Sequence, residues 1–508
     1  MTEQVPTQFT LGIVGAGLMG GGIAQVSAQA GIRTLIFDMK AGAAVTAKQN
    51  LGSTFQRLAA RGKISGDDVV KALANIEPVD SLAALAVCNI VIEAIVENLD
   101  VKKEIFRNLE EVVNSSCVLA TNTSSLSVTS IAAACRLPER VGGFHFFSPV
   151  PLMRVVEVID GVRTEPRVGE ILIALANRIG HTPVRARDTP GFIVNHAGRG
   201  YGTEALRILG ENVASFHVID RILCEGAGFR MGPFELLDMT GLDISQPVMD
   251  SIYRQYYEEP RFRPSPLLLQ RKEAGLLGRK TGIGFYQYID TKIESIQLGP
   301  VPTARPVCVW ISRIRADVYG LVSALVGELG GNLDTGERPA ADSLCLVMPI
   351  GNDATTCAVE ENLDAQRTIA IDTLFGMNTH RTLMATPVTT EQMRVAALGL
   401  FQADGIPASL IRDSAGLIAQ RVIAHIVNIA CDIAQQGIAT PSDIDCAVTL
   451  GLGYRQGPLT MGDTIGPAKI LTVLEALQDF YGDPRYRPSP WLKRRARLGI
   501  SLLTTDIA

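Results

Sequence analysis

A glycine-rich turn between a short apolar run and a helical segment places the strongest constraint on how this chain folds. Residues 11–14 have the apolar, β-branched character of a buried parallel strand, and residues 18–30 have that of a helix. Between them stand Gly15, Gly17 and Gly20, whose spacing allows a tight turn, a close approach of a pyrophosphate to the backbone, and close packing of helix on strand. Amide groups at the start of the helix then face the phosphates. We therefore expect a dinucleotide-binding site here.

A second apolar run, residues 34–37, follows the helix and ends at Asp38. An acidic residue about 20 positions after the glycines accepts a hydrogen bond from the ribose 2′-hydroxyl of NAD, a position that carries a phosphate in NADP. The glycine spacing alone is a weak signal, because glycines also cluster in ordinary turns. Together with the flanking strand, helix and acid, it predicts NAD as the cofactor.

The composition is that of a globular protein with several domains. The chain has 508 residues, of which 47% are hydrophobic and 19% charged, and its net charge of −5 excludes a general basic surface for nucleic acid. Its apolar runs are shorter than the ~18 residues of a membrane span, and the N-terminus lacks the features of a signal peptide. The nine cysteines are scattered, without a Cys-x-x-Cys pair. We expect a cytoplasmic protein with free thiols and no bound metal, membrane or nucleic acid.

Strand and helix patterns alternate from residue 9 to about 186, which predicts a doubly wound α/β sheet of the Rossmann type. From residue 187 the apolar spacing becomes helical, and it stays so until a Lys-Thr-Gly-x-Gly-Phe-Tyr segment at 280–286. Residues 291–305 contain Gly299-Pro300 and several polar residues, and we interpret them as a linker.

The rest of the chain contains a repeat of the helical domain. Residues 413–420 match residues 188–195 at an offset of 225, and Asp463 falls on Asp238 at the same offset. The intervening segment has strands and helices but Ser312–Arg315 in place of a glycine-rich loop. The predicted segments are a Rossmann domain (1–186), a first all-α helical domain like that of 6-phosphogluconate dehydrogenase (187–290), a linker (291–305), a reduced Rossmann-like domain without a glycine-rich loop (306–408), and a second, non-catalytic helical domain (409–508).

Four polar residues are candidates for chemistry. His145 and Glu157 lie on two predicted strands joined by the turn 148–151, so the carboxylate can hold one ring nitrogen and leave the other as a base. The alternative is a core histidine among aromatic residues. Ser124 follows a strand at the carboxyl edge of the sheet, where such folds bind ligands, although a serine there also caps a helix. Asn195, in the first turns of a helix after Pro190-Gly191, is either a site residue or a polar residue at a helix start.

Over nearly its whole length the chain resembles the 3-hydroxyacyl-CoA dehydrogenase family. The resemblance rests on the glycine-rich start and on the ordered motifs at 93–98, 122–125, 145–151, 188–195, 232–238 and 280–286. The length and the duplicated helical domain resemble the bacterial long form linked to phenylacetate breakdown. In the second repeat, Gln420 replaces Asn195 and the motif at 280–286 has no counterpart. We therefore expect one active site and one NAD in each chain.

The resemblance implies roles for individual residues. His145 is implied as the general base with Glu157 as its partner, and Ser124 and Asn195 as hydrogen-bonding groups around the reacting oxygen. Thr54 and Arg61 match positions where the family contacts coenzyme A, usually with Ser and Lys; the alternative is that the basic residues around Arg61 form a solvated helix end. The residues that we expect near NAD are Gly15, Gly17, Leu18, Met19, Gly20, Asp38, Glu97, Lys102, Ser148 and Lys280. Ser148 stands where the family has Asn, which shortens the reach of this side chain.

The implied activity is the reversible, NAD-dependent oxidation of an L-3-hydroxyacyl-CoA to the 3-ketoacyl-CoA. We expect 3-hydroxyadipyl-CoA as the substrate, with 3-hydroxybutyryl-CoA as the second choice. The alternative from another class is a non-catalytic NAD-binding scaffold derived from this family. A homodimer remains open, since the second helical domain can supply the partner surface within one chain as an internal pseudo-dimer.

Overall fold

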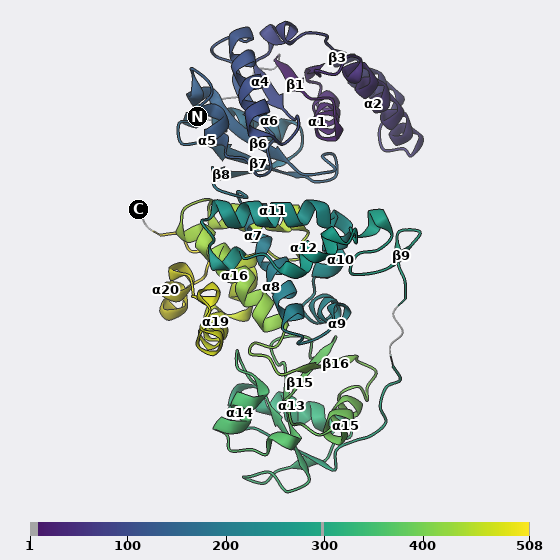
Figure 1. Cartoon of the computed structure of the whole chain (residues 1–508), viewed down its shortest axis with the longest axis vertical. Coiled ribbons are helices and arrows are strands. Elements are labelled where there is room, and N and C mark those ends of the chain that lie inside the picture. The colour runs from purple at the N-terminus through teal and green to yellow at the C-terminus, as the bar shows by residue number, and fades with distance from the viewer. Residues whose placement is uncertain (1–8, 296–298, 507–508) are drawn as a thin grey trace. The chain divides into compact units, whose positions relative to one another are not determined.

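The computed structural model describes residues 9–295 and 299–506, which divide into two compact units (Figure 1). The first unit contains residues 9–196 together with 436–453, and the second contains 197–435 together with 454–506. Within the described residues, no helix has the length and apolar character needed to cross a membrane.

The first unit is built on one eight-stranded sheet with the strand order β3-β2-β1-β4-β5-β6-β7-β8. Neighbouring strands run parallel except for β6 and β7, which are antiparallel. The strands are β1 (Thr10–Val14), β2 (Arg33–Phe37), β3 (Ile76–Pro78), β4 (Ile90–Glu93), β5 (Val118–Thr121), β6 (Val141–Phe146), β7 (Val155–Asp160) and β8 (Thr182–Arg187). This is the predicted Rossmann topology, with an antiparallel pair toward one edge.

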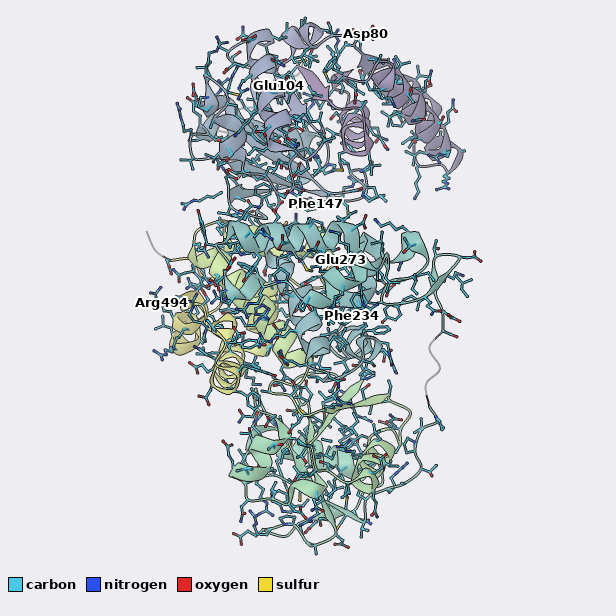
Figure 2. All side chains as sticks on the ribbon, in the orientation of Figure 1. Asp80, Glu104, Phe147, Phe234, Glu273 and Arg494 are labelled. Atoms are coloured by element: carbon cyan, nitrogen blue, oxygen red, sulfur yellow. The ribbon has the colours of Figure 1, made fainter. Side chains whose placement is uncertain are left out.

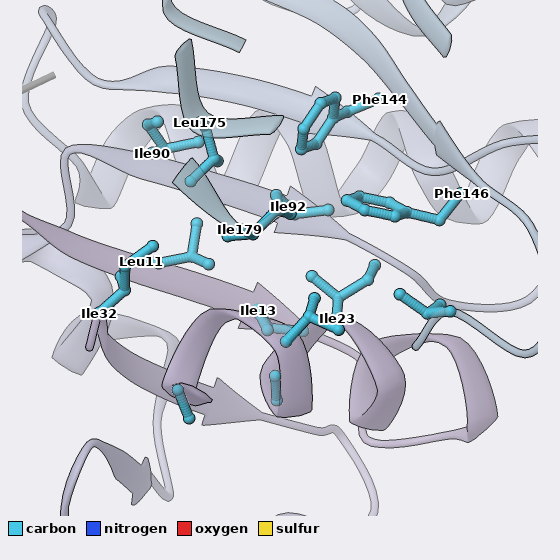
Figure 3. Packing of buried hydrophobic residues seen from close by; sticks show 14 of the residues in the cluster. Leu11, Ile13, Ile23, Ile32, Ile90, Ile92, Phe144, Phe146, Leu175 and Ile179 are labelled. Atoms are coloured by element: carbon cyan, nitrogen blue, oxygen red, sulfur yellow. The ribbon is translucent and has the colours of Figure 1, made fainter. Parts of the chain in front are cut away.

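Helices cover both faces of this sheet. They are α1 (Leu18–Gln29), α2 (Ala43–Ala60), α3 (Gly66–Ala74), α4 (Leu99–Val112), α5 (Val128–Ala132), α6 (Pro166–Arg178), α7 (Val194–Ala197) and α17 (Pro441–Leu452). Leu11 and Ile13 pack with α1 and α6 on one face (Figure 3), whereas Val14 packs with Phe106 of α4 on the other. Because successive side chains of a strand point to opposite faces, one short strand contributes to both cores. Each such buried side chain contributes about 1.5–3 kcal/mol.

The second unit combines a smaller sheet with a group of helices. Its six-stranded sheet has the order β12-β11-β13-β14-β15-β16, with only β14 and β15 antiparallel. The strands are β11 (Cys308–Ile311), β12 (Leu333–Asp334), β13 (Ser343–Val347), β14 (Thr368–Ile371), β15 (Arg381–Ala385) and β16 (Ala408–Arg412), besides a hairpin of β9 (Tyr288–Ile289) and β10 (Lys292–Ile293). The helices are α8 (Arg199–Gly210), α9 (Phe216–Arg221), α10 (Pro233–Thr240), α11 (Leu242–Gln255), α12 (Pro266–Glu273), α13 (Ala316–Glu328), α14 (Ala354–Glu360), α15 (Glu391–Phe401), α16 (Ala419–Gln435), α18 (Pro458–Ile465), α19 (Pro467–Tyr481) and α20 (Pro490–Leu498).

The second half of the chain repeats the first in backbone detail. Glu157 pairs with Val184 between β7 and β8, and the residues 225 positions later, Thr382 and Ser409, pair between β15 and β16. Phe192 has a φ of 50°, and its counterpart Leu417 has a φ of 47°. A positive φ is rare for a residue with a branched or bulky side chain, so its recurrence at this offset marks a true duplication.

The two copies exchange one helical segment. Helix α17 belongs to the second copy by sequence, but it packs on β7 and β8 of the first unit, and the amide of Arg187 donates to the carbonyl of Ile438 (2.8 Å). The segment 225 positions earlier, α9 with the π-helical turn Ile222–Gly226, packs instead on β15 of the second unit. There the Glu225 carboxylate lies 2.6 Å from Nδ1 of His380. Each sheet is therefore covered by a helix from the opposite copy.

Several boundaries differ from the sequence expectations. The segment with helical apolar spacing after residue 187 begins with two helices, α7 and α8, which are separated at Gly198. The hairpin of β9 and β10 extends to Ile293, inside the predicted linker. Strands β3, β12, β15 and β16 were not predicted, because they are short or lack a clean alternation. The compact units do not follow the five predicted segments, since α17 packs with the first unit; the division into five segments stays a prediction.

Candidate active site

The antiparallel pairing of β6 and β7 places His145 directly opposite Glu157. The Nδ1 atom of His145 lies 2.6 Å from Oε2 of Glu157, and both side chains are buried. The other oxygen, Oε1, accepts hydrogen bonds from the backbone amides of Ile193 and Val194, at 2.9 Å each. An ionised carboxylate only accepts, so with Glu157 in that form Nδ1 is the donor of the pair and Nε2 is the ring nitrogen free to meet a substrate. This is the arrangement of an oriented general base.

Aromatic rings surround the imidazole. The ring centroid of Phe147 lies 4.5 Å from that of His145, and that of Phe192 lies 5.8 Å away. Phe147, labelled in Figure 2, stands in the turn after β6, whereas Phe192 belongs to the segment that leads into α7. Apolar walls lower the local dielectric and strengthen the interaction between imidazole and carboxylate.

The loop after β5 is held by one carboxylate. Oε1 of Glu97 accepts hydrogen bonds from the Thr123 hydroxyl (2.7 Å), the Ser124 amide (2.9 Å) and the Ser125 amide (3.0 Å), and from both serine hydroxyls. Burial raises the pKa of Glu97, but the Lys102 ammonium and these hydrogen bonds outweigh it and leave the pKa below its ordinary value. Glu97 therefore stays ionised and fixes the position of Ser124.

Ser124 and Asn195 lie together. The Nδ2 group of Asn195 donates to the carbonyl of Ser124 at 3.5 Å. The same loop is tied to the strand of His145, because Oδ1 of Asn122 accepts from the amide of Phe146 (2.8 Å). Asp188 secures the following helix through the amides of Val128 (3.0 Å) and Thr129 (2.7 Å). The four candidate catalytic residues thus come from β6, β7, the loop after β5 and the first turn of α7.

The glycine-rich turn leaves room for a pyrophosphate. Gly15 has a φ of 109°, and a Cβ on Gly20 would stand 1.9 Å from the carbonyl oxygen of Gly15, so neither position accepts a side chain. A Cβ on Gly17 would meet nothing within 4 Å, and no side chain caps the helix that begins after it. Oδ2 of Asp38 accepts from the amide of Ala16 (2.7 Å), which brings the acid beside the turn. These residues fit a bound dinucleotide.

The remaining residues expected near NAD lie in different surroundings. Lys102 is buried and paired with Glu93 (2.5 Å), which also accepts from the Thr121 hydroxyl (2.7 Å). Sequence reasoning missed this cluster, although an acid at the end of a buried strand was its signal. Leu18 and Ser148 are exposed, and Met19 is half-buried. Lys280 belongs to the second unit, where it pairs with Asp243 at 2.5 Å.

The residues expected at coenzyme A lie on or beside α2. Thr54 lines a shallow depression on this helix and accepts a hydrogen bond from the Arg57 guanidinium (3.1 Å). Arg61 follows the last residue of the helix and does not line the depression. Arg57 is therefore a nearer cationic partner of Thr54 than Arg61.

Comparison with known proteins identifies the family. The model of the 3-hydroxyacyl-CoA dehydrogenase NAD-binding domain matches residues 10–189, and that of the C-terminal domain matches residues 191–288 and again 416–501. The chain belongs to the 3-hydroxyacyl-CoA dehydrogenase family. It is therefore an oxidoreductase, and the second match accounts for the repeat detected at an offset of 225.

Relatives from bacteria and animals resemble this member of the family to different extents. The 3-hydroxyadipyl-CoA dehydrogenase of Escherichia coli K12 is 37% identical over 96% of this chain and 98% of its own length. The mitochondrial hydroxyacyl-coenzyme A dehydrogenase of Homo sapiens is 39% identical over 54% of this chain and 90% of its own length. A crystal structure of 3-hydroxybutyryl-CoA dehydrogenase from Escherichia coli K12 superposes with a TM-score of 0.85, at 35% identity over 97% of this chain and 99% of that one.

The second copy has no counterpart of the pair formed by His145 and Glu157 within the described residues. Asp372 follows β14, and its amide donates to the carbonyl of Thr382, the residue 225 positions after Glu157. Asp372 therefore lies opposite Thr382 as His145 lies opposite Glu157. Burial raises the pKa of the Asp372 carboxyl to about 6. Gln420, the counterpart of Asn195, donates to Oδ1 of Asp372 (3.0 Å) and accepts from the amide of Gly351 (3.0 Å). Gln420 thus satisfies Oδ1 of Asp372, whereas Oδ2 is buried without a hydrogen-bond partner in the described part of the chain.

Proposed function

We propose that this protein catalyses the reversible, NAD-dependent oxidation of an L-3-hydroxyacyl-CoA to the corresponding 3-ketoacyl-CoA at the site formed by His145, Glu157, Ser124 and Asn195. The observation that carries the proposal is the buried contact of 2.6 Å between His145 and Glu157. A structural histidine needs no carboxylate that is itself anchored by two backbone amides, whereas a general base needs its ring held in one tautomer.

The residues of the chain divide the chemistry among them. Nε2 of His145 takes the proton of the substrate hydroxyl, and Glu157 stabilises the resulting imidazolium. Ser124 and Asn195 orient the substrate oxygens by hydrogen bonds, and the rings of Phe147 and Phe192 exclude water from the imidazole. When bound, NAD supplies the hydride acceptor for C3. In the reverse direction His145 returns its proton to the oxygen.

The direct test follows NADH. On addition of acetoacetyl-CoA, the absorbance of NADH is expected to fall with multiple turnovers per chain. A non-catalytic NAD-binding scaffold would bind NADH without consuming it. NADPH should support a much lower kcat/KM, because Asp38 repels the 2′-phosphate.

For the acyl group, we propose 3-hydroxyadipyl-CoA as the substrate and 3-hydroxybutyryl-CoA as the second candidate. The first candidate is supported by the E. coli relative named 3-hydroxyadipyl-CoA dehydrogenase, which matches this chain over 98% of its own length. The second is supported by the similar E. coli structure, which is named 3-hydroxybutyryl-CoA dehydrogenase. A series of kcat/KM values over chain length, with and without a terminal carboxylate, decides between them. A strong preference for long neutral chains would contradict both.

We also propose that the two helical copies form an internal pseudo-dimer on which the first copy depends. The exchange of α17 for its counterpart covers β7, the strand of Glu157, with a helix from the second copy. A chain truncated after residue 290 should therefore be insoluble or inactive. A soluble, monomeric and fully active truncated chain would contradict this proposal.

A further inference from the structure

A cleft of about 460 Å³ lies within the second unit. Four segments line it: residues 227–229 after the π-helical turn, residues 373–375 after β14, Ile423 of α16, and parts of residues 455–469 from the turn before α18, from α18 and from the start of α19. Sites for small organic ligands commonly have volumes of about 300–1,000 Å³, so the cleft has the size of a ligand site.

The position of this cleft follows from the duplication. Because Asp372 stands where His145 stands in the first copy, the lining residues 373–375 follow β14 as residues 146–148 follow His145. In α/β sheets, ligands bind where the chain leaves the ends of the strands. The second copy has therefore lost the catalytic pair but retains a cleft at the corresponding edge of its own sheet.

The lining has the chemistry of a site for an amphiphilic anion. Its apolar part includes Phe229, Leu374 and Phe375, and the charged residues among its described lining are Arg455 and Lys469. Within the described residues, no carboxylate lines the cleft and neither cation forms an ion pair. Asp317 pairs with Arg315 at 2.7 Å, and this pairing and, more weakly, the Lys469 ammonium lower the pKa of Asp317.

Two further details concern the polar groups of the cleft. The hydroxyl of Thr373, which lines the cleft, is buried and has no hydrogen-bond partner within the described part of the chain. Buried hydroxyls are rarely left without a partner, so such a group marks a place where a ligand or water binds. Lys469 falls on Ile244 at the offset of 225, so this cation is peculiar to the second copy.

We propose that the cleft binds an organic anion with an apolar chain, namely a medium-chain carboxylate. Arg455 and Lys469 hold its carboxylate, with the Thr373 hydroxyl as a further donor, and its chain packs on Phe229 and Phe375. All of these groups belong to the second unit, and the inference does not rest on the proposed dehydrogenase activity. The second copy is then a binding module, which explains why a cleft with cations persists there without catalytic residues.

The test is calorimetric titration of the full chain with sodium octanoate and, separately, with octanol. Octanoate is expected to bind at least tenfold more tightly than octanol, and more weakly as the salt concentration rises. In the double variant Arg455→Gln/Lys469→Gln, the affinity for octanoate should fall at least tenfold. Turnover of acetoacetyl-CoA by this variant should stay within twofold of wild type, since neither residue belongs to the candidate active site.

A matched variant keeps the result interpretable. Arg412→Gln/Arg497→Gln removes two exposed cations of the same unit that do not line the cleft, and it should bind octanoate as wild type does. Arg455→Lys retains the charge and should bind within about threefold of wild type. Equal affinity of the cleft variant and wild type, or no octanoate binding to wild type at millimolar concentration, would overturn the proposal.

Discussion

His145 and Glu157 face each other across an antiparallel strand pair, with Nδ1 and Oε2 separated by 2.6 Å. The second oxygen of Glu157 accepts hydrogen bonds from the backbone amides of Ile193 and Val194, the two residues that precede Asn195. One carboxylate thus orients the base and fixes the start of the helix that carries another candidate site residue. The site is arranged around Glu157 as much as around the histidine.

Glu157→Gln should leave the fold intact and disable the base. The amide oxygen of glutamine still accepts from the backbone, but its NH₂ group then faces Nδ1 of His145 and favours the tautomer with the proton on Nε2. A general base typically contributes ~10²–10⁴-fold, so we expect a loss of that size in kcat with little change in KM. Steady-state kinetics with acetoacetyl-CoA measure it, and a kcat within twofold of wild type would contradict the assigned role.

The chain should bind one NAD. The glycine-rich turn with its open space at Gly17 follows β1, whereas Ser312–Arg315 follows β11, the first strand of the smaller sheet. Titration of NADH fluorescence against a known concentration of chains should therefore end at a ratio of one. A ratio of two would mean that the second sheet also binds the cofactor.

The duplicated half should contribute to stability through a buried ion pair. Arg421 of α16 and Glu204 of α8 come from different copies, are fully buried, and lie 2.6 Å apart. Breaking a buried pair typically costs about 3–5 kcal/mol, because the remaining charge is left in a medium of low dielectric. Arg421→Met should thus lower the thermal midpoint far more than Arg254→Met, which breaks an exposed pair with Asp250. Similar midpoints for the two variants would show that the pair is dispensable.

The second unit should lose stability in acid through His425. Burial lowers the pKa of His425 to about 3, with Arg485 and Arg261 acting in the same direction and Glu204 opposing them. Between pH 6.5 and pH 3, His425 is protonated in the unfolded protein but not in the folded protein. The free energy of unfolding therefore falls as the pH falls through this window. At pH 5 the loss from this group is about 2 kcal/mol relative to pH 8.

The variant His425→Gln removes that titration. Its thermal midpoint should fall less than that of wild type between pH 8 and pH 5, while at pH 8 both imidazole and amide are neutral and serve as the reference. Equal falls in the two proteins would show that His425 is not the group responsible.

Local sequence patterns were sufficient to predict that His145 and Glu157 lie close together. Runs of apolar residues predicted β1 and β2, and the short turn at 148–151 placed His145 and Glu157 on neighbouring strands. The order of motifs predicted the family, and the constant offset predicted the duplication. These inferences succeed because each depends on residues close together in the chain or on a repeated pattern.

Other features depend on tertiary packing and could not be predicted in this way. The exchange of α17 follows from contacts between segments far apart in sequence, such as the hydrogen bond between Arg187 and Ile438. The place of Lys102 near NAD stays a prediction, and its buried ion pair with Glu93 was not predicted. A helical pattern shows which side of a helix is apolar, but it does not show which carboxylate a lysine will reach.

Matched substitutions at the two equivalent positions test the central claim most directly, namely that catalysis resides in the first copy on His145. The measurement is kcat for NADH-dependent reduction of acetoacetyl-CoA by wild type, His145→Gln and Asp372→Asn. We predict a loss of ~10²–10⁴-fold for His145→Gln and a change of less than twofold for Asp372→Asn. An unchanged kcat for His145→Gln, or an equal loss in both variants, would contradict the account.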